Sequence, residues 1–270
     1  MDIGFIGIGN MGGAILSGYM EAGNTGAGRV LVYNRSVERC EKMKARFPQI
    51  EICGSSSELC RSCDIVIIGV KPQGVGSVLE EIAGEFTSDK TVVSMAAGVK
   101  ISVFEKYLGE DAAVIRIMPN TPAMVGEGMV AVCRNAGVKD EVFEAAMGIF
   151  SRTGRAEEVD EELIDCVIGV SGSSPAYTYM YIEALMQAAV DNGMDEEKAR
   201  VFAAQAVLGA ARMVLESPES VEQLRLNVCS PNGTTIEAVN TLFENGFMDK
   251  VKEGFQAAVD RSVEMGKEER

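Results

Sequence analysis

The chain of 270 residues lacks histidine altogether and is short of basic side chains, with 25 lysines and arginines against 40 aspartates and glutamates. Without histidine, Ser-His and Cys-His catalytic pairs and His-ligated metal sites are excluded. The formal net charge of −15 disfavours nucleic acid and acidic membranes as partners, and its simplest role is solubility. Any catalysis must therefore use other groups, and we expect no metal.

Long apolar runs are also missing. The longest nearly pure run, Ile65 to Val70, has the length of a strand, and the start of the chain lacks the apolar block of a signal peptide. The seven cysteines are scattered, and the one close pair, Cys60-Arg-Ser-Cys63, lacks both the second pair of a zinc site and the context of a redox site. We therefore expect a globular, cytoplasmic protein with reduced cysteines, and a helix turn in which the Cys60 and Cys63 thiols are half-buried.

The start of the chain carries a motif for binding a dinucleotide. A short apolar strand from Ile3 runs into a Gly-x-Gly-x-x-Gly turn and then into a helical pattern. In this context the glycines permit a tight turn and a close approach of the backbone to a pyrophosphate. The alternative is a glycine-rich turn without a ligand. The cofactor contacts expected here are Gly7, Ile8, Gly9, Asn10, Met11 and Gly12.

The second predicted strand, from Arg29 to Tyr33, ends in Asn34-Arg35-Ser36. A site specific for NAD places an acidic residue here to bind the ribose 2′-hydroxyl, whereas an amide, a guanidinium and a hydroxyl suit a 2′-phosphate. We therefore predict that NADP(H) is preferred over NAD(H), with Asn34, Arg35 and Ser36 as contacts. The alternative is that Arg35 is a solvated surface charge.

Four further strands and a final helix are predicted between residues 64 and 150. This alternation is typical of a doubly wound, mostly parallel sheet that binds ligands at the carboxyl ends of its strands. The small residues that end the strand at 91–98 let a nicotinamide ring lie close, while Lys71 and Asn120 are contacts or, alternatively, ordinary polar residues at strand ends. The contacts expected at these strand ends are Val70, Lys71, Pro72, Ala97, Gly98 and Asn120.

After about Glu158 the strand pattern gives way to six helices. They are expected to cover residues 161–170, 174–192 and 195–216, to begin at Ser217-Pro218 and at Ser230-Pro231, and to cover residues 247–265. Their wide apolar faces favour a homodimer through this half, and the alternative is a self-contained bundle. The sequence thus predicts an α/β fold, with an N-terminal Rossmann-type doubly wound sheet in residues 1–158 and an all-α C-terminal dimerisation domain in residues 159–270.

The most distinctive stretch of the chain is residues 227–240. Ser230 and Pro231 have the order of a helix N-cap and a first-turn proline. Gly233 lets the backbone approach a ligand, and the two threonines after it add N–H groups and hydroxyls at the positive end of the helix. This combination predicts a site for a small anion, most simply a carboxylate, without any general acid or base stronger than threonine.

Taken together, these segments resemble pyrroline-5-carboxylate reductases along the whole chain. The matching segments, of which the last is the most specific, are Phe5-Ile-Gly-x-Gly-Asn-Met-Gly-x-Ala-Ile15, Val70-Lys-Pro-Gln73, Met95-Ala-Ala-Gly98, Arg116-x-Met-Pro-Asn-Thr-Pro-Ala123, Ser171-Gly-Ser-x-Pro-Ala-Tyr177 and Val228-Cys-Ser-Pro-Asn-Gly-Thr-Thr-Ile236. The resemblance implies reduction of 1-pyrroline-5-carboxylate to L-proline with NAD(P)H, the last step of proline biosynthesis. A cyclic imine is already electrophilic, so a site built of amides and hydroxyls agrees with this chemistry.

The resemblance also implies roles for individual residues. The catalytic group is Thr235, with its hydroxyl directed at the ring nitrogen, although the sequence leaves open whether it or solvent supplies the proton. In such enzymes the substrate binds where the C-terminal helices of one subunit meet the cofactor domain of another, and dimers often assemble into decamers. The implied substrate contacts are Glu161, Ser230, Gly233, Thr234 and Thr235, and the further cofactor contacts are Ser56 near the adenine ribose and Asn227 near the nicotinamide.

Three positions depart from the family pattern: Ser174 and Asn232 stand where glycine is usual, and Phe243 where a polar or acidic residue is usual. None of them removes a group that the chemistry needs. A β-hydroxyacid dehydrogenase, which uses a lysine early in its helical half, is disfavoured because no lysine occurs between Lys139 and Lys198. Two further functions fit the same motifs, namely reduction of another cyclic imine acid and binding of NADPH without catalysis. Turnover assays with the imine distinguish them.

Overall fold

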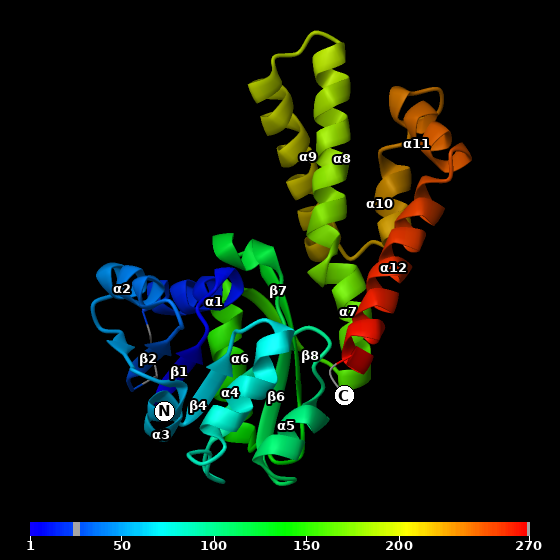
Figure 1. Ribbon diagram of the computed structural model, residues 1–270. Helices are drawn as coiled ribbons and strands as arrows, with labels where there is room; N and C mark the ends of the chain where they lie inside the picture. Colours follow the sequence, from blue (N-terminus) through cyan, green and yellow to red (C-terminus); the bar gives the residue numbers. More distant parts are fainter. Residues whose placement is uncertain (24–27, 269–270) are drawn as a thin grey trace. The chain divides into compact units, whose positions relative to one another are not determined.

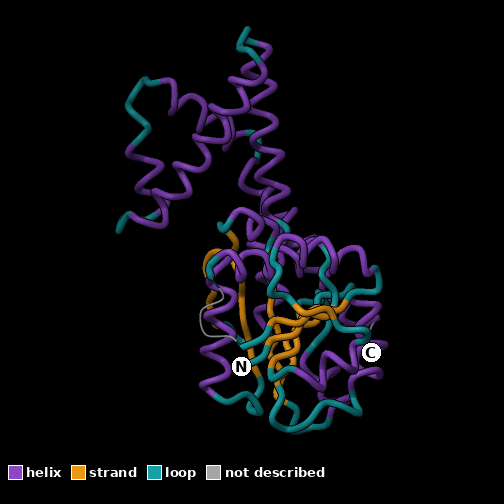
Figure 2. The backbone as a smooth tube through the Cα atoms, turned by 90° about the vertical axis from the view of Figure 1, so that its left-hand side faces the viewer, coloured by secondary structure: helices purple, strands orange, loops and turns teal. Residues whose placement is uncertain are grey.

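The computed structural model describes residues 1–23 and 28–268 and divides into two compact units. The first, the sheet unit, contains Met1–Ser173 and the described residues from Ala257 onward; the second, the helical unit, is Ser174–Gln256. Figures 1 and 2 show that the strands lie in the sheet unit, whereas the helical unit consists of helices and their connections. The predicted boundary at residue 158 coincides with the end of the last strand, but the compact sheet unit continues to Ser173.

The sheet unit is built on an eight-stranded sheet with the order β3-β2-β1-β4-β5-β6-β7-β8 (Figure 1). Neighbouring strands pair in parallel except β6 and β7, which are antiparallel, so the predicted mostly parallel sheet is confirmed. The strands are β1 (Ile3–Ile6), β2 (Val30–Tyr33), β3 (Glu51–Ile52), β4 (Ile65–Ile68), β5 (Thr91–Ser94), β6 (Ala113–Met118), β7 (Gly128–Arg134) and β8 (Gly154–Glu158). β8 was not predicted from the sequence because it is largely charged, as is common for an edge strand, and so lacks an apolar strand pattern.

Helices cover both faces of this sheet, and a hydrophobic cluster fills the space on each side. One cluster includes residues of α1, α2 and α6, and the other includes residues of α3, α4, α5 and α7. The helices of this unit are α1 (Asn10–Glu21), α2 (Val37–Arg46), α3 (Ser56–Ser62), α4 (Val75–Ile82), α5 (Ile101–Leu108), α6 (Asp140–Phe150) and α7 (Ile164–Val167), with short 3₁₀ or π turns η1 (Pro72–Gly74), η2 (Thr121–Val125), η3 (Ser151–Thr153), η4 (Glu161–Leu163) and η5 (Ile168–Gly172). Because both faces of β1 and β4 are covered, their sequences are continuously apolar.

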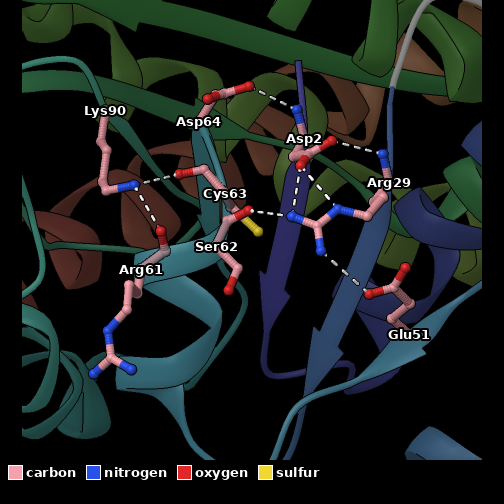
Figure 3. A network of polar contacts seen from close by, with 8 residues as sticks. All are labelled: Asp2, Arg29, Glu51, Arg61, Ser62, Cys63, Asp64 and Lys90. Atoms are coloured by element: carbon pink, nitrogen blue, oxygen red, sulfur yellow. Dashed lines mark hydrogen bonds and ion pairs between the residues drawn. The ribbon is translucent and has the colours of Figure 1, made fainter.

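The amino ends of β1 to β5 are linked by charged side chains, which we call the amino-edge network: Asp2, Arg29, Glu51, Asp64 and Lys90 (Figure 3). The carboxylate of Asp2 accepts hydrogen bonds from the backbone N–H of Arg29 at 2.7 Å and from its guanidinium at 2.8 and 3.0 Å. The backbone N–H of Asp2 donates to Asp64 at 2.7 Å, and the Lys90 ammonium donates to two backbone carbonyls at 2.9 and 3.3 Å. The network fixes the strands at the edge opposite the predicted ligand site.

The helical unit contains four whole helices and the first part of a fifth. They are α8 (Ser174–Asp191), α9 (Glu196–Glu216), α10 (Val221–Asn227), α11 (Thr234–Glu244) and α12 (Phe247–Glu268), whose residues from Ala257 belong to the sheet unit. The predicted helix start at Ser217-Pro218 is wrong, because the hydroxyl of Ser220 accepts a hydrogen bond from the N–H of Gln223 at 3.1 Å and caps α10 instead. Within residues 1–23 and 28–268, none of the helices combines the length and apolar character that a membrane span requires.

Candidate functional site

The turn after β1 forms a cradle for an anion. Gly7 has a φ of +88°, in the left-handed region that favours glycine. A Cβ on Gly12 would lie 2.4 Å from the carbonyl oxygen of Gly7, so α1 reaches the turn only because position 12 is glycine. α1 begins at Asn10 with Gly9 as its N-cap, and no described side chain caps it. The N–H groups of its first turn are therefore free to bind a pyrophosphate.

Asn34, at the end of β2, holds this turn in place. Its Oδ1 atom accepts a hydrogen bond from the N–H of Ile8 at 3.2 Å, and its Nδ2 atom donates to the carbonyl of Ser36 at 3.0 Å. The side-chain amide thus helps to shape the loop, and its direct contact with a cofactor stays a prediction. The Ser36 hydroxyl donates to Glu38, whereas Arg35 is exposed and forms no ion pair with any residue that the structure describes.

Arg39 is a further cationic residue beside the glycine turn. Its Nη1 atom lies 3.6 Å from the point where a Cβ of Gly9 would stand. The side chain is exposed and, within the described ranges, has no acidic partner, although the chain has 40 acidic residues. It lines a cavity of about 780 Å³ that also borders Gly9 and Asn10. Sequence reasoning missed Arg39; the available signal was its place in the first turn of the helix that Ser36 begins.

A second cavity, of about 400 Å³, opens at the carboxyl ends of β1, β2 and β4. Ser56, predicted to lie near the adenine ribose, is fully buried and does not line this cavity; its hydroxyl donates to Glu81, which does. Pro72 begins η1, with the exposed Lys71 as its N-cap. The fold therefore gathers several of the predicted cofactor residues around one hollow. Predicted contacts that line it are Gly7, Asn34, Arg35, Val70 and Lys71.

The loops after β5 and β6 contain the remaining predicted cofactor residues of the sheet unit. Ala97 is partly exposed, and Gly98 has a φ of +77° and packs against the last turn of α12. Asn120 is buried: its Nδ2 atom donates to the carbonyl of Ser171 at 3.0 Å, and its Oδ1 atom accepts from the N–H of Met129 at 2.9 Å. Asn120 therefore ties the loop to η5 and to β7, and its direct contact with a cofactor stays a prediction.

Glu161 serves a buried arginine. Its Oε1 atom accepts hydrogen bonds from the N–H of Ile101 at 2.8 Å and from Nη1 of Arg116 at 3.0 Å. Arg116 is only 2% exposed, so the carboxylate neutralises a charge that would otherwise be buried alone. Its Nε atom has no hydrogen-bond partner among the described residues. Glu161 therefore joins α5 to β6, and its contact with substrate stays a prediction.

In the helical unit, the signature at residues 227–236 forms a turn and then the start of α11. The predicted N-cap role of Ser230 is wrong: its carbonyl accepts the N–H of Gly233 at 3.0 Å in a turn, and α11 begins at Thr234 with Gly233 as N-cap. Asn232 has a φ of +60°, the one positive value at a non-glycine residue in the described chain. This conformation explains why glycine is usual at that position, and asparagine tolerates it.

The first turn of α11 has the features of the predicted anion site. No described side chain caps it, so the N–H groups of Thr234, Thr235 and Ile236 are unsatisfied at the positive end of the helix. Both threonines are exposed. Asn227 differs: its amide donates to Glu219 at 2.8 Å and accepts from Gln223 at 2.7 Å, so it stabilises α10 and the segment before it.

Most of the cysteines are buried. All seven are free, and burial raises the pKa of the Cys60 thiol to about 11 and that of the Cys63 thiol to about 12. These side chains are fully buried rather than half-buried, and they stay protonated at neutral pH. In the part of the chain that the structure describes, no group of three or more potential ligands could hold a metal ion.

The doubly wound sheet with its dinucleotide cradle and the separate all-helical unit define an oxidoreductase that uses a nicotinamide dinucleotide. Comparison with known families agrees: residues 2–98 match the model described as NADP oxidoreductase, coenzyme F420-dependent, and residues 161–265 match the model described as pyrroline-5-carboxylate reductase dimerisation. The chain belongs to the pyrroline-5-carboxylate reductase family, as the following relatives show.

Its similarity to individual family members extends over the full length. It is 44% identical to the pyrroline-5-carboxylate reductase of Escherichia coli K12, over 98% of both chains. The solved structure of the Coxiella burnetii pyrroline-5-carboxylate reductase is 34% identical, with a TM-score of 0.90 over 97% of both chains. That of the Plasmodium falciparum pyrroline carboxylate reductase, with NADP bound, is 32% identical, with a TM-score of 0.87 over 98% of both chains.

Proposed function

We propose that the chain reduces 1-pyrroline-5-carboxylate to L-proline by hydride transfer from NADPH, as the last step of proline biosynthesis. The observation that carries the proposal is the uncapped first turn of α11, which lies within the segment most specific to the family. Its free N–H groups suit the carboxylate of this substrate. The cradle at Gly7 to Gly12 suits the dinucleotide, since its glycines leave the backbone open and α1 has no capping side chain.

The residues of the chain bind and orient the reactants. The first-turn amides of α11 neutralise the substrate carboxylate, with Ser230 and Thr234 adding hydroxyl donors. The Thr235 hydroxyl accepts a hydrogen bond from the protonated ring nitrogen and so fixes the imine carbon in position. When bound, the cofactor supplies the hydride. Because the protonated imine is already electrophilic, this arrangement needs no histidine and no strong acid.

The proposed preference for NADPH rests on unpaired positive charge around the end of β2. Arg35 lines the 400 Å³ cavity and Arg39 lies beside Gly9, and neither forms an ion pair with a described residue. The nearest carboxylate along the chain, Glu38, already accepts a hydrogen bond from Ser36. A 2′-phosphate matches two guanidinium groups better than a 2′-hydroxyl does.

Assembly follows from the helical unit, which is matched by a dimerisation model and exposes large apolar side chains such as Met180 and Phe202. A surface of this kind needs a partner chain to cover it. The proposed assembly is a homodimer that further assembles into a decamer, in the cytoplasm, where free thiols are maintained. Light scattering on the purified protein measures the number of subunits.

The deciding experiment follows the absorbance of NADPH, and then of NADH, after 1-pyrroline-5-carboxylate is added to the purified protein. Rapid loss of the NADPH signal, with proline as product, supports the reductase. Turnover only with a six-membered cyclic imine acid would replace the substrate. NADPH binding without turnover of either imine would favour a non-catalytic binding protein. Equal rates with both cofactors would contradict the proposed preference.

A further inference from the structure

The last turn of α12 packs on the loop that follows β5. A Cβ on Gly266 would lie 2.9 Å from the carbonyl oxygen of Gly98, and a Cβ on Gly98 would lie 3.1 Å from the backbone nitrogen of Gly266. We infer that this last turn is a positioning element for the loop at residues 95–98, which the proposed function assigns to the nicotinamide. The inference rests on that proposed function for the role of the loop.

Both glycines are required by the contact itself. Gly98 has a φ of +77°, which other residues adopt only with strain, and its Cβ position is also 3.1 Å from the Cβ of Met265. The close approach of α12 thus explains why position 98 is glycine. On the helix side, glycine costs up to about 1 kcal/mol relative to alanine in a helix interior. Gly266 has a packing reason to be there, since it lets the helix backbone touch the loop.

A second contact fixes the same end of α12. Ser262 is 4% exposed, and its hydroxyl donates a hydrogen bond of 2.5 Å to Oδ1 of Asp165, on α7. Ser262 and Gly266 are one helical turn apart, so they lie on the same face of α12. One contact anchors the helix to α7, and the other presses it against the loop.

The loop has little local support of its own. The N–H of Val99 reaches the carbonyl of Ala96 at 3.4 Å, a long hydrogen bond, and the N–H of Ala96 donates to the Ser94 hydroxyl at 3.2 Å. The N–H of Met95 also donates to the carbonyl of Ile68 at 3.3 Å, and Ala96 and Val99 are buried in the core. At Gly98, the position of the loop depends on the helix behind it. A displacement of about 1 Å at a hydride-transfer site can cost on the order of a hundredfold in rate.

The test compares two alanine substitutions in the same helix. Gly254 has no heavy atom within 4 Å of its Cβ position, so Gly254→Ala adds a methyl group to open space, whereas Gly266→Ala pushes against Gly98. NADPH affinity is measured by titration of cofactor fluorescence. Steady-state kinetics with 1-pyrroline-5-carboxylate give kcat and KM. We expect Gly266→Ala to weaken NADPH binding and lower kcat by about tenfold or more, with the helix content unchanged by circular dichroism. Gly254→Ala should stay within about twofold of the wild type on both measures.

Equal behaviour of the two variants overturns the inference. If the wild type binds NADPH but does not turn over the imine, the proposed substrate is wrong. The comparison of NADPH affinities needs no substrate, so it still tests the role of α12. If Gly266→Ala does not fold, Ser262→Ala decides, because it removes the anchoring hydrogen bond without adding atoms. A weakened NADPH affinity in the folded Ser262→Ala protein supports the inference, and an unchanged affinity overturns it.

Discussion

The two edges of the parallel sheet treat charge in opposite ways. At the amino edge, the cations Arg29 and Lys90 are satisfied by Asp2, Glu51 and backbone carbonyls (Figure 3). At the carboxyl edge, the ends of the same strands meet glycines and the uncapped first turn of α1. Arg35 and Arg39 there are left without an acidic partner among the described residues. One edge is closed by its own side chains, and the other is open.

This difference identifies the ligand side of the sheet. The chain carries 40 acidic and 25 basic residues, so an arginine without a carboxylate partner is not explained by a shortage of carboxylates. Arg39 stands beside Gly9, the N-cap of the helix whose N-terminus already favours negative charge, and Arg35 lines the cavity that Gly7 also borders. The amino edge stabilises the fold, while the unpaired cations of the carboxyl edge support the proposal that an anionic ligand binds there.

The largest effect should come from filling the cradle with a side chain. In Gly12→Ala, the new Cβ would lie 2.4 Å from the carbonyl oxygen of Gly7, so α1 or the turn must shift. We expect a loss of about 2 kcal/mol in stability and loss of measurable NADPH binding. Gly13→Ala is the matched control, because its Cβ meets its nearest atom, the carbonyl oxygen of Ile8, at an ordinary 3.6 Å. Denaturant unfolding measures the stability and fluorescence titration measures NADPH binding. Equal results for the two variants would mean that the close approach of Gly12 to Gly7 is not needed for cofactor binding.

Next in size are the unpaired arginines of the carboxyl edge. Arg35→Ala and Arg39→Ala should each weaken NADPH binding about tenfold and leave NADH binding nearly unchanged, since each removes a charge-assisted bond to the 2′-phosphate. Arg46→Ala is the control: Arg46 lines the same cavity as Arg39 but is paired with Glu21. Dissociation constants for both cofactors give the answer, and the 2′-phosphate assignment is wrong if NADH suffers as much as NADPH.

Much of this site was predictable because its signals are local. The glycine spacing after β1 predicts the turn, and the apolar run of β6 predicts the strand. Both elements lie where the sequence predicts them. The mostly parallel pairing of the strands also follows from the alternation of strands and helices, whereas their order comes from the structure alone. Local patterns, however, do not show what a side chain meets in space. Asn34 and Asn120 are predicted as ligand contacts, and no local pattern shows that their amides also bind backbone groups of distant segments.

The errors have physical causes as well. Ser230 and Pro231 fit the statistics of a helix start, but the left-handed conformation of Asn232 prolongs the turn until Gly233. β8 was missed because, as an edge strand, it is mostly charged and lacks an apolar pattern. Arg39 was missed because its sequence pattern does not distinguish a ligand-binding arginine from a solvated arginine on a helix surface. The contact between Gly98 and Gly266 joins residues far apart in the chain and has no local signature.

A smaller effect is expected at α11, because Thr235 contributes a single neutral hydrogen bond to the proposed reaction. Thr235→Ala should lower kcat/KM for 1-pyrroline-5-carboxylate by about three- to tenfold and leave NADPH affinity intact. Thr235→Ser keeps the hydroxyl and should recover most of the activity. Steady-state kinetics and a cofactor titration distinguish the roles: an equal loss of NADPH affinity contradicts the assignment of Thr235 to the substrate.

The smallest effect on function should come from the amino edge, where Asp2→Asn tests the other half of the comparison. The hydrogen bond from the N–H of Arg29, together with its guanidinium, lowers the pKa of Asp2 below its ordinary value. A lowered pKa in the folded state stabilises the fold above the unfolded pKa of about 3.9, and this stabilisation is lost as the pH falls through the folded pKa. Asp2→Asn should therefore lower the midpoint of thermal unfolding at pH 7, because an amide then faces the guanidinium. The difference from the wild type should shrink in acid.

Calorimetry at neutral and acidic pH measures this change in the midpoint of thermal unfolding, and NADPH affinity should be unaffected. A pH-independent difference, or a change in cofactor binding, would mean that the two edges are not separate in function.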